Sequence, residues 1–247
     1  MITNDDGYRA KGLHKLVSLV RPLGRVIVVS TENVMSAKGH SITISEPMRL
    51  RKMVEEDNLV EYICNGTPAD CIKIGQKVLG TPDIVLSGIN HGSNASVNAI
   101  YSGTVAAVIE GCMNGYPSVA FSVDEYGSDA YFDHVDGFLV AIVEKVIANG
   151  LPKNVCLNVN FPKYNGKPID GVSVCRQSMA RWVEDVVPRT DPHGLNYYWF
   201  DGRLLNEDND KGTDSYALEH NLVSVVPINY DWTDYKSIDY IKNWNLK

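Results

Sequence analysis

Two adjacent carboxylates, Asp5 and Asp6, stand near the start of the chain in the stretch ITNDDGYRAKG. Neighbouring carboxylates repel one another, and burying them without a partner costs free energy. A solvated loop avoids that cost, and a bound cation turns the repulsion into ligation. Taken alone, adjacent aspartates after a strand are more often a turn or a helix cap than a metal site. The choice between the two therefore depends on what other loops bring to the same place.

Polar residues follow three of the strands that the sequence predicts. NDDG, at residues 4–7, follows the first strand, a hydroxyl-rich run at residues 30–41 follows RVIVVS, and GINHGSN at residues 88–94 follows PDIVLS. Ligands of an open parallel sheet bind at the carboxyl ends of its strands, near a switch in strand order. We therefore expect these loops to share one rim, where their oxygen atoms suit Mg²⁺, Mn²⁺ or Ca²⁺ better than a soft metal.

The sequence Ser102-Gly103-Thr104 opens an alanine-rich helical pattern. Main-chain N–H groups and hydroxyls at a helix start bind anions, helped by the helix dipole. A hard cation beside such a site equips a protein for phosphoester hydrolysis, because the metal lowers the pKa of a bound water from about 15.7 toward ~7. An ordinary helix cap also explains Ser-Gly-Thr by itself. Together, the residues predict a metal-assisted site for a phosphate-like anion.

The elements that position these loops alternate between strand and helix. Apolar runs predict strands over residues 25–30, 82–90, 118–123 and 154–162, and helical spacing predicts helices over residues 12–21, 104–115 and 131–148. This alternation predicts a doubly wound, mostly parallel α/β sheet. After Pro162, short strand-like pieces predict a β-hairpin extension. We expect residues 1–165 to form the core that carries the site, and residues 166–247 to form the hairpin and a C-terminal segment that pack on a neighbouring subunit.

Composition excludes several classes of protein. The 247 residues, 44% hydrophobic and 21% charged, are typical of a globular protein with a large core. A net charge of -7 argues against a nucleic-acid binder, sequence-specific or general. Five scattered cysteines without a CxxC pair predict reduced core thiols in a cytoplasmic protein. We find no membrane-spanning run, leader, P-loop or dinucleotide fingerprint, so we expect no membrane partner.

The order of motifs resembles the SurE (stationary-phase survival protein) family. TNDDG is followed by GHSIT, NGTPADC, PDIVLSGIN and YSGTVAAVIEG, and then by LNVNFP, RTDPHGLNYYWFDG and GTDSYAL, across nearly the whole chain. The resemblance implies a Rossmann-like core with a protruding hairpin, assembly into homodimers or homotetramers, and metal-dependent hydrolysis of nucleoside 5′- and 3′-monophosphates, with cleavage of short polyphosphate in some members. The alternatives are a non-catalytic metal- or polyphosphate-binding oligomer and a metal-dependent transferase.

The resemblance also implies roles for individual residues. One divalent cation per subunit is expected, Mg²⁺ or Mn²⁺, with Ca²⁺ as a non-native occupant. Its implied ligands are Asp5, Asp6, Ser36 and Asn90, of which the two aspartates are also the implied catalytic residues. The residues implied to contact phosphate are Asn94, Ser102, Gly103 and Thr104.

Two departures from the family pattern affect the site. Residues 95–98 read Ala-Ser-Val-Asn where many members carry a Gly-Asp-Asp-like run, which leaves the substrate preference open. The chain also begins about three residues later than that pattern, so we expect a short central strand behind Asp5. The base of a nucleotide has one candidate platform, Tyr197, Tyr198 and Trp199, although such residues in a strand more often pack a hairpin or a subunit contact.

Overall fold

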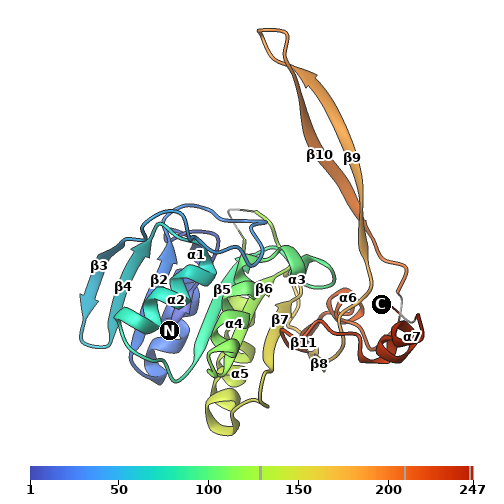
Figure 1. The fold of residues 1–247 in the computed structure, drawn as a ribbon. Coiled ribbons are helices and arrows are strands. Elements are labelled where there is room, and N and C mark those ends of the chain that lie inside the picture. The colour runs from blue at the N-terminus through green and yellow to red at the C-terminus, as the bar shows by residue number, and fades with distance from the viewer. Residues whose placement is uncertain (128–129, 209, 245, 247) are drawn as a thin grey trace.

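The computed structural model describes residues 1–127, 130–208, 210–244 and 246 of the chain. Within them, a nine-stranded sheet runs in the order β3-β4-β2-β1-β5-β6-β7-β11-β8 (Figure 1). The parallel strands are β4 (Leu59–Cys64), β2 (Val26–Thr31), β1 (Ile2–Thr3), β5 (Val85–His91), β6 (Ser118–Val123) and β7 (Cys156–Phe161). At the edges, β3 (Leu50–Glu56) and β11 (Leu222–Ile228) run antiparallel to their inner neighbours, and β8 (Gly171–Val174) runs parallel to β11. The predicted mostly parallel α/β fold is confirmed.

Helices cover both faces of this sheet (Figure 1). One face carries α1 (Lys11–Val20) and α5 (Asp136–Asn149), and the other carries α2 (Pro68–Val78) and α4 (Gly103–Met113). The shorter elements are η1 (Arg21–Leu23), α3 (Asn98–Tyr101), η2 (Asp133–Val135), α6 (Asp214–Glu219), η3 (Tyr235–Ser237) and α7 (Ile238–Lys242). No helix within the described residues is long and apolar enough to cross a membrane.

The central strands are buried on both faces, which explains their nearly continuous apolar sequence. Val28 of β2 and Leu86 of β5 pack in the cluster that includes α1 and α5, whereas their neighbours Val29 and Val85 pack toward α2 and α4. This alternation is the two-residue period of a strand. The central strands are therefore enclosed between two layers of helices, and their carboxyl ends are left open to a ligand.

The strand order reverses direction between β1 and β5. Ile2 of β1 pairs with Val28 of β2 on one side and with Leu86 of β5 on the other. The chain then builds outward in both directions, through β2 and β4 on one side and β6 and β7 on the other. This is the switch point at which doubly wound sheets bind their ligands. The expected short first strand is present as the two residues of β1, and Asp5 follows it after one residue, Asn4.

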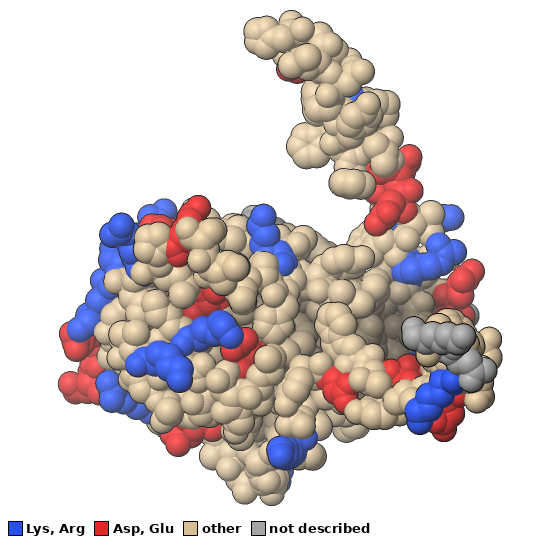
Figure 2. Space-filling model, viewed as in Figure 1, with Lys and Arg blue, Asp and Glu red and all other residues tan. Residues whose placement is uncertain are grey.

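A long antiparallel hairpin projects from this body (Figure 1). It consists of β9 (Arg181–Thr190) and β10 (Asn196–Leu205), which pair over their whole length. The predicted extension is thus confirmed, although β8 and β11, which also follow residue 165, belong to the main sheet. Figure 2 shows few charges on the outer part of the hairpin and an acidic patch nearer the body. The large exposed apolar side chains of the hairpin include Val186, Leu195, Tyr197, Tyr198, Trp199 and Phe200.

The close approach of α1 to β5 depends on Gly12, the second residue of that helix. A Cβ atom at this position would lie 2.0 Å from the main-chain oxygen of Ile89. We expect Gly12→Ala to push the helix away from the strand and to cost about 1–3 kcal/mol of unfolding free energy, which urea titration measures.

Gly137→Ala is the matched control for this variant. Gly137 is also the second residue of a helix, α5, and a Cβ atom there meets nothing within 4 Å. Alanine has the higher helix propensity, so we expect unchanged or increased stability, by up to ~1 kcal/mol. Equal losses of unfolding free energy in Gly12→Ala and Gly137→Ala would show that the close approach of α1 to β5 is not the cause of the destabilisation.

Candidate active site

A cavity of about 950 Å³ lies at the rim where β1 and β5 end. Five residues singled out from the sequence line it together, namely Asp5, Ser36, Asn90, Asn94 and Ser102. Three others, Asp6, Gly103 and Thr104, are not among its lining residues. The loops after β1, β2 and β5 and the start of α4 therefore meet at one place, as their positions after the strands predict.

Asp5 is almost fully buried, with 3% of its surface exposed, and rests against the first turn of α4. Thr104 Oγ1 donates a hydrogen bond to Asp5 Oδ1 over 2.5 Å. Gly103 allows this contact, because a Cβ atom there would lie 3.0 Å from Asp5 Oδ2. In this structure the helix start expected to face phosphate thus holds a carboxylate of the chain itself.

Burial raises the pKa of Asp5, although the hydrogen bond from Thr104 and main-chain N–H groups oppose this shift. Asp6 accepts a hydrogen bond from the main-chain N–H of His91 over 3.0 Å. Burial and the adjacent charge of Asp5 raise the pKa of Asp6 to about 6. Among the ion pairs of the described residues, none includes either aspartate. The two acids therefore repel each other, and only the nearby His91 side chain, which lowers the pKa of Asp6, opposes this repulsion in part.

This pair fits a hard divalent cation. Within the described residues, no group of three or more acidic, histidine or cysteine side chains is placed to hold a metal, so neutral oxygen atoms must complete the donor set. Asn90 donates through its amide nitrogen to the oxygen of Gly92 over 2.7 Å, which leaves its amide oxygen free for another partner. Ser36 is exposed and lines the same cavity. Carboxylate, amide and hydroxyl oxygens are the ligands that Mg²⁺, Mn²⁺ and Ca²⁺ prefer.

The long loop that carries Ser36, residues 32–49, is tied to the body at several points. The N–H of Met35 donates to the main-chain oxygen of Asp5 over 2.7 Å, and the N–H of Gly39 donates to Tyr101 over 2.9 Å. Farther along, the N–H of Thr43 donates to both carboxylate oxygens of Asp70 over 3.1 Å. These contacts fix the loop beside Asp5, although it contains neither helix nor strand.

The buried carboxylate of Glu110 also holds this loop in place. Glu110 of α4 accepts a hydrogen bond from Lys73 over 2.8 Å and lies 3.3 Å from His40 of the loop. Burial alone would raise the pKa of Glu110, but the hydrogen bonds from His40 and Lys73 outweigh it and lower that pKa to about 2. His40 therefore connects the loop to α4, the helix that also holds Asp5.

Asn94 is held by a buried amide network that the sequence did not reveal. Its N–H donates to Asn160 Oδ1 over 2.8 Å, and its side-chain nitrogen donates to Ser122 Oγ over 2.8 Å. Asn158 donates to the main-chain oxygen of Asn94 over 2.9 Å. The sequence run LNVNF could have indicated this network, because two asparagines occupy alternate positions of a buried strand in it.

The aromatic residues at the cavity differ from the suggested platform. Tyr197, Tyr198 and Trp199 are not among its lining residues. Their neighbours in the hairpin, Trp182 and Phe200, line it instead. Trp182 and Phe200 were missed because hairpin register and orientation, rather than local sequence, decide which side chains face the body.

Comparisons with known proteins show the family and the fold of the chain. The family model described as "Survival protein SurE" matches residues 1–184. The chain is 44% identical to a 5'-nucleotidase SurE of Christiangramia forsetii, with 100% of this chain and 96% of that protein covered. It is 40% identical to a 5'-nucleotidase SurE of Flavobacterium psychrophilum, with 100% and 97% covered. The crystal structure of the SurE protein from Aquifex aeolicus matches with a TM-score of 0.85 and 38% identity over 99% of this chain and 98% of that one.

The acid pair predicts a cation effect that depends on pH. Both pKa values are raised in the folded protein, so without metal each carboxyl group contributes most to stability at low pH, and the contribution of Asp6 is lost as the pH rises through about 6. A cation reverses this loss. We expect Mn²⁺ to raise the thermal midpoint by several degrees at pH 7.5 and hardly at all at pH 5, where protons compete for the carboxylates.

Asp6→Asn provides the control for this measurement. Removing one of the two charges relieves the repulsion, so we expect the metal-free midpoint at pH 7.5 to rise while the shift with Mn²⁺ largely disappears. An equal Mn²⁺ shift at both pH values, or in both proteins, would show that the cation binds elsewhere.

Proposed function

The chain belongs to the survival protein SurE family, and from that premise we propose that it is a metal-dependent phosphatase that converts nucleoside monophosphates to nucleoside and inorganic phosphate. The relatives named 5'-nucleotidase support the activity. One observation carries the assignment to this site: Asp5 and Asp6 form an acid pair, without an ion-pair partner among the described residues, at the switch point of the sheet.

We propose that one Mg²⁺ or Mn²⁺ per chain is held by Asp5, Asp6, Asn90 and Ser36. When bound, the cation neutralises phosphate oxygens and makes water a better nucleophile at neutral pH. The chain's own contribution is to fix the donor atoms. Thr104 and the first turn of α4 hold the Asp5 carboxylate in one orientation, and the N–H of His91 does the same for one oxygen of Asp6. Water is the proposed nucleophile, because Asp5 is already engaged by these donors.

Asn94 and Ser102 are the proposed phosphate contacts. Asn94 uses one amide hydrogen for Ser122, so its second hydrogen is available to a phosphate oxygen at the cavity. Ser102 Oγ accepts from the N–H of Val105 over 3.1 Å, which leaves its own proton free to be donated. Gly103 and Thr104 have a different proposed role, that of holding Asp5 rather than touching phosphate.

The cavity also bears on the range of substrates. It is open enough for a phosphate on either the 5′ or the 3′ oxygen of a ribose, and we propose activity on both. Among its described lining residues are Asp5, Glu184 and Asp201 but no lysine or arginine. Because a polyanion would bring several negative charges against these acids, we expect short polyphosphate to be the poorer substrate.

We propose that the protein is a single domain whose hairpin mediates assembly into a homodimer or homotetramer. A two-stranded ribbon is at best marginally stable in water, and this one exposes three aromatic side chains that do not line the cavity, Tyr197, Tyr198 and Trp199. A second copy would cover them. The cytoplasm is the proposed compartment, because all five cysteines are free and buried.

Phosphate release from a panel of nucleoside monophosphates, with Mn²⁺, with Mg²⁺ and with EDTA, tests this proposal. We expect release only with metal. Asp6→Asn should lower kcat/KM roughly a hundredfold or more, because it removes a charged donor from the cation. Asp57→Asn, an exposed aspartate in the turn between β3 and β4, is the matched control and should leave kcat/KM unchanged.

Two results would oppose the proposal. Full metal-dependent activity in Asp6→Asn would remove the acid pair from the site. Cation binding without phosphate release from any substrate would instead favour the non-catalytic metal-binding oligomer.

A further inference from the structure

We propose that Trp182, Glu184 and Phe200, at the body-facing side of the hairpin, form the wall that binds the nucleoside part of the substrate. The proposal rests on the proposed function, because it takes the phosphate end of the cavity as given. It adds a specificity surface that comes from a different part of the chain than the acid pair.

The cavity has two chemically different ends. The end formed by Asp5, Asn90 and Asn94 is polar and suits a cation and a phosphate. The hairpin contributes Trp182 and Phe200, two large rings that remain 41% and 83% exposed although they line a cavity. A volume of about 950 Å³ lies at the upper end of the range for small-molecule sites. A ligand anchored by its phosphate at the first end has room to reach these rings.

The register of the hairpin places these side chains on one face. Glu184 pairs with Gly202, Trp182 pairs with Leu204, and Phe200 pairs with Val186. Residues two apart in a strand share a face, so Trp182, Glu184 and Phe200 all project to the same side. Gly202 has no side chain, which leaves the face open directly opposite Glu184. Trp199 projects to the other side and, unlike Asp201 of that side, is not among the lining residues.

Trp182 is also fixed to the loop that carries Asn94. Its indole N–H donates to Asn98 Oδ1 over 2.9 Å, and the amide nitrogen of Asn98 donates to the main-chain oxygen of Ser93 over 3.2 Å. The edge of the indole is thereby held in place, and its face remains available for stacking. Such preorganisation lowers the entropy that is lost when a ligand binds.

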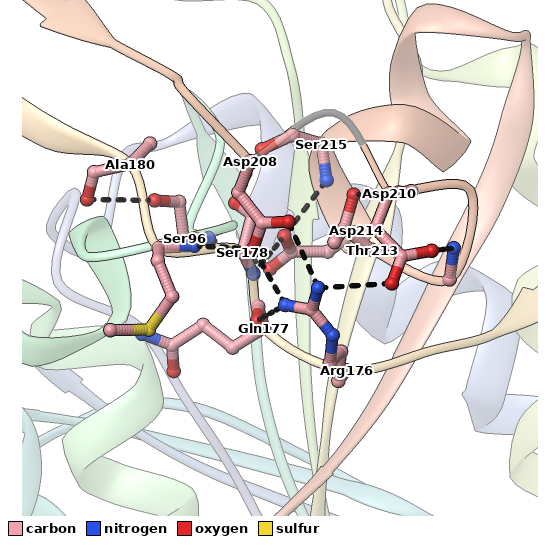
Figure 3. Close-up of polar contacts among 12 residues, drawn as sticks. Ser96, Arg176, Gln177, Ser178, Ala180, Asp208, Asp210, Thr213, Asp214 and Ser215 are labelled. Carbon is pink, nitrogen blue, oxygen red and sulfur yellow. Dashed lines mark hydrogen bonds and ion pairs between the residues drawn. The ribbon is translucent and has the colours of Figure 1, made fainter.

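The root of the hairpin is clamped to the same loop through Asp214, a fully buried carboxylate (Figure 3). Asp214 Oδ2 accepts from the N–H of Ser96 over 2.7 Å, and Oδ1 accepts from the N–H groups of Ser178 and Ser215 over 2.9 and 2.8 Å. One side chain thus joins the loop after β5, the segment before β9 and the start of α6. The clamp fixes where the hairpin leaves the body, only a few residues before Trp182.

A second clamp joins the two sides of the root, as Figure 3 also shows. Arg176 donates to both oxygens of Asp208 over 2.6 and 2.9 Å and to Asp210 over 3.2 Å. Asp208 also accepts from the N–H of Met179 over 3.2 Å. The segments before β9 and after β10 are therefore bound to each other, and the contacts of Asp214 with Ser96 join this root to the body.

The chemistry of the wall identifies its occupant. Bases stack on aromatic side chains regardless of sequence, because every base has a π face. The carboxylate of Glu184 accepts hydrogen bonds from N–H or O–H donors, which bases and ribose provide, and it repels further phosphate groups. A nucleoside attached to a single phosphate meets both requirements.

Kinetics with two substrates tests this wall. Ribose 5-phosphate carries the same phosphate as a nucleoside 5′-monophosphate but has no base to stack. We expect Trp182→Ala and Phe200→Ala to raise KM for adenosine monophosphate roughly tenfold and to leave KM for ribose 5-phosphate unchanged. Trp199→Ala, on the opposite face of the same strand, is the matched control and should change neither value. Light scattering checks that each variant keeps the assembly state of the wild type.

Adenosine binding, followed by tryptophan fluorescence without metal, provides a readout that needs no catalysis. We expect binding by the wild type and by Trp199→Ala and a loss of roughly tenfold in affinity in Phe200→Ala. If no phosphate is released from any substrate, the proposed function fails while this titration still tests the wall. Unchanged KM values in Trp182→Ala and Phe200→Ala, together with unchanged adenosine affinity in Phe200→Ala, would overturn the proposal. Equal effects of these substitutions on the KM values of the two substrates would overturn it as well.

Discussion

The burial of the Asp5 carboxylate beside Asp6 is the constraint on which the rest of the structure depends. An acid with 3% exposure needs donors, and it finds them in Thr104 and the first turn of α4. That contact requires a glycine at position 103 and sets how closely α4 approaches the end of β1. Repulsion from Asp5 also contributes to the raised pKa of Asp6. The raised pKa values mean that the pair destabilises the fold at neutral pH, and the proposed cation would relieve this cost.

In the proposed cation site, neutral donors from other segments join this pair. Because β1 and β5 are adjacent strands, their ends bring Asn90 and Asp5 to the same cavity. The loop of Ser36 is held by the ion pair of Glu110 and by the cap of α2, and Asn94 is held by asparagines from β7. Asp214 then links the Asn94 loop to the hairpin, so that two regions far apart in sequence border one cavity. The rigidity of the site comes from buried polar networks rather than from regular secondary structure at the site itself.

The predictable part of the fold and site follows from burial. β2, β5, β6 and β7 are covered on both faces and appear in the sequence as apolar runs, and the loops at their ends could be assigned to one rim by the switch-point rule alone. The strand β3 was missed, because this exposed edge strand is rich in charged residues. The helix α2 was also missed, although the Thr67–Asp70 capping box marks its start.

The remaining site features depend on packing between distant segments. Thr104 faces Asp5 because of the depth at which α4 packs against the end of β1. Trp182 faces the cavity because the contacts of Asp214 fix the root of the hairpin. Neither depth nor orientation is encoded in the local pattern of residues around these positions. Family resemblance supplied the set of implied ligands, whereas only coordinates could show which donors each of them already has.

Anomalous diffraction from crystals soaked in Mn²⁺ tests most directly whether the acid pair is a cation site. We predict one strong peak per chain within about 2.0–2.5 Å of carboxylate oxygens of Asp5 and Asp6 and of the amide oxygen of Asn90. A fully soaked crystal with no peak there, or with its strongest peak elsewhere on the chain, would contradict the assignment.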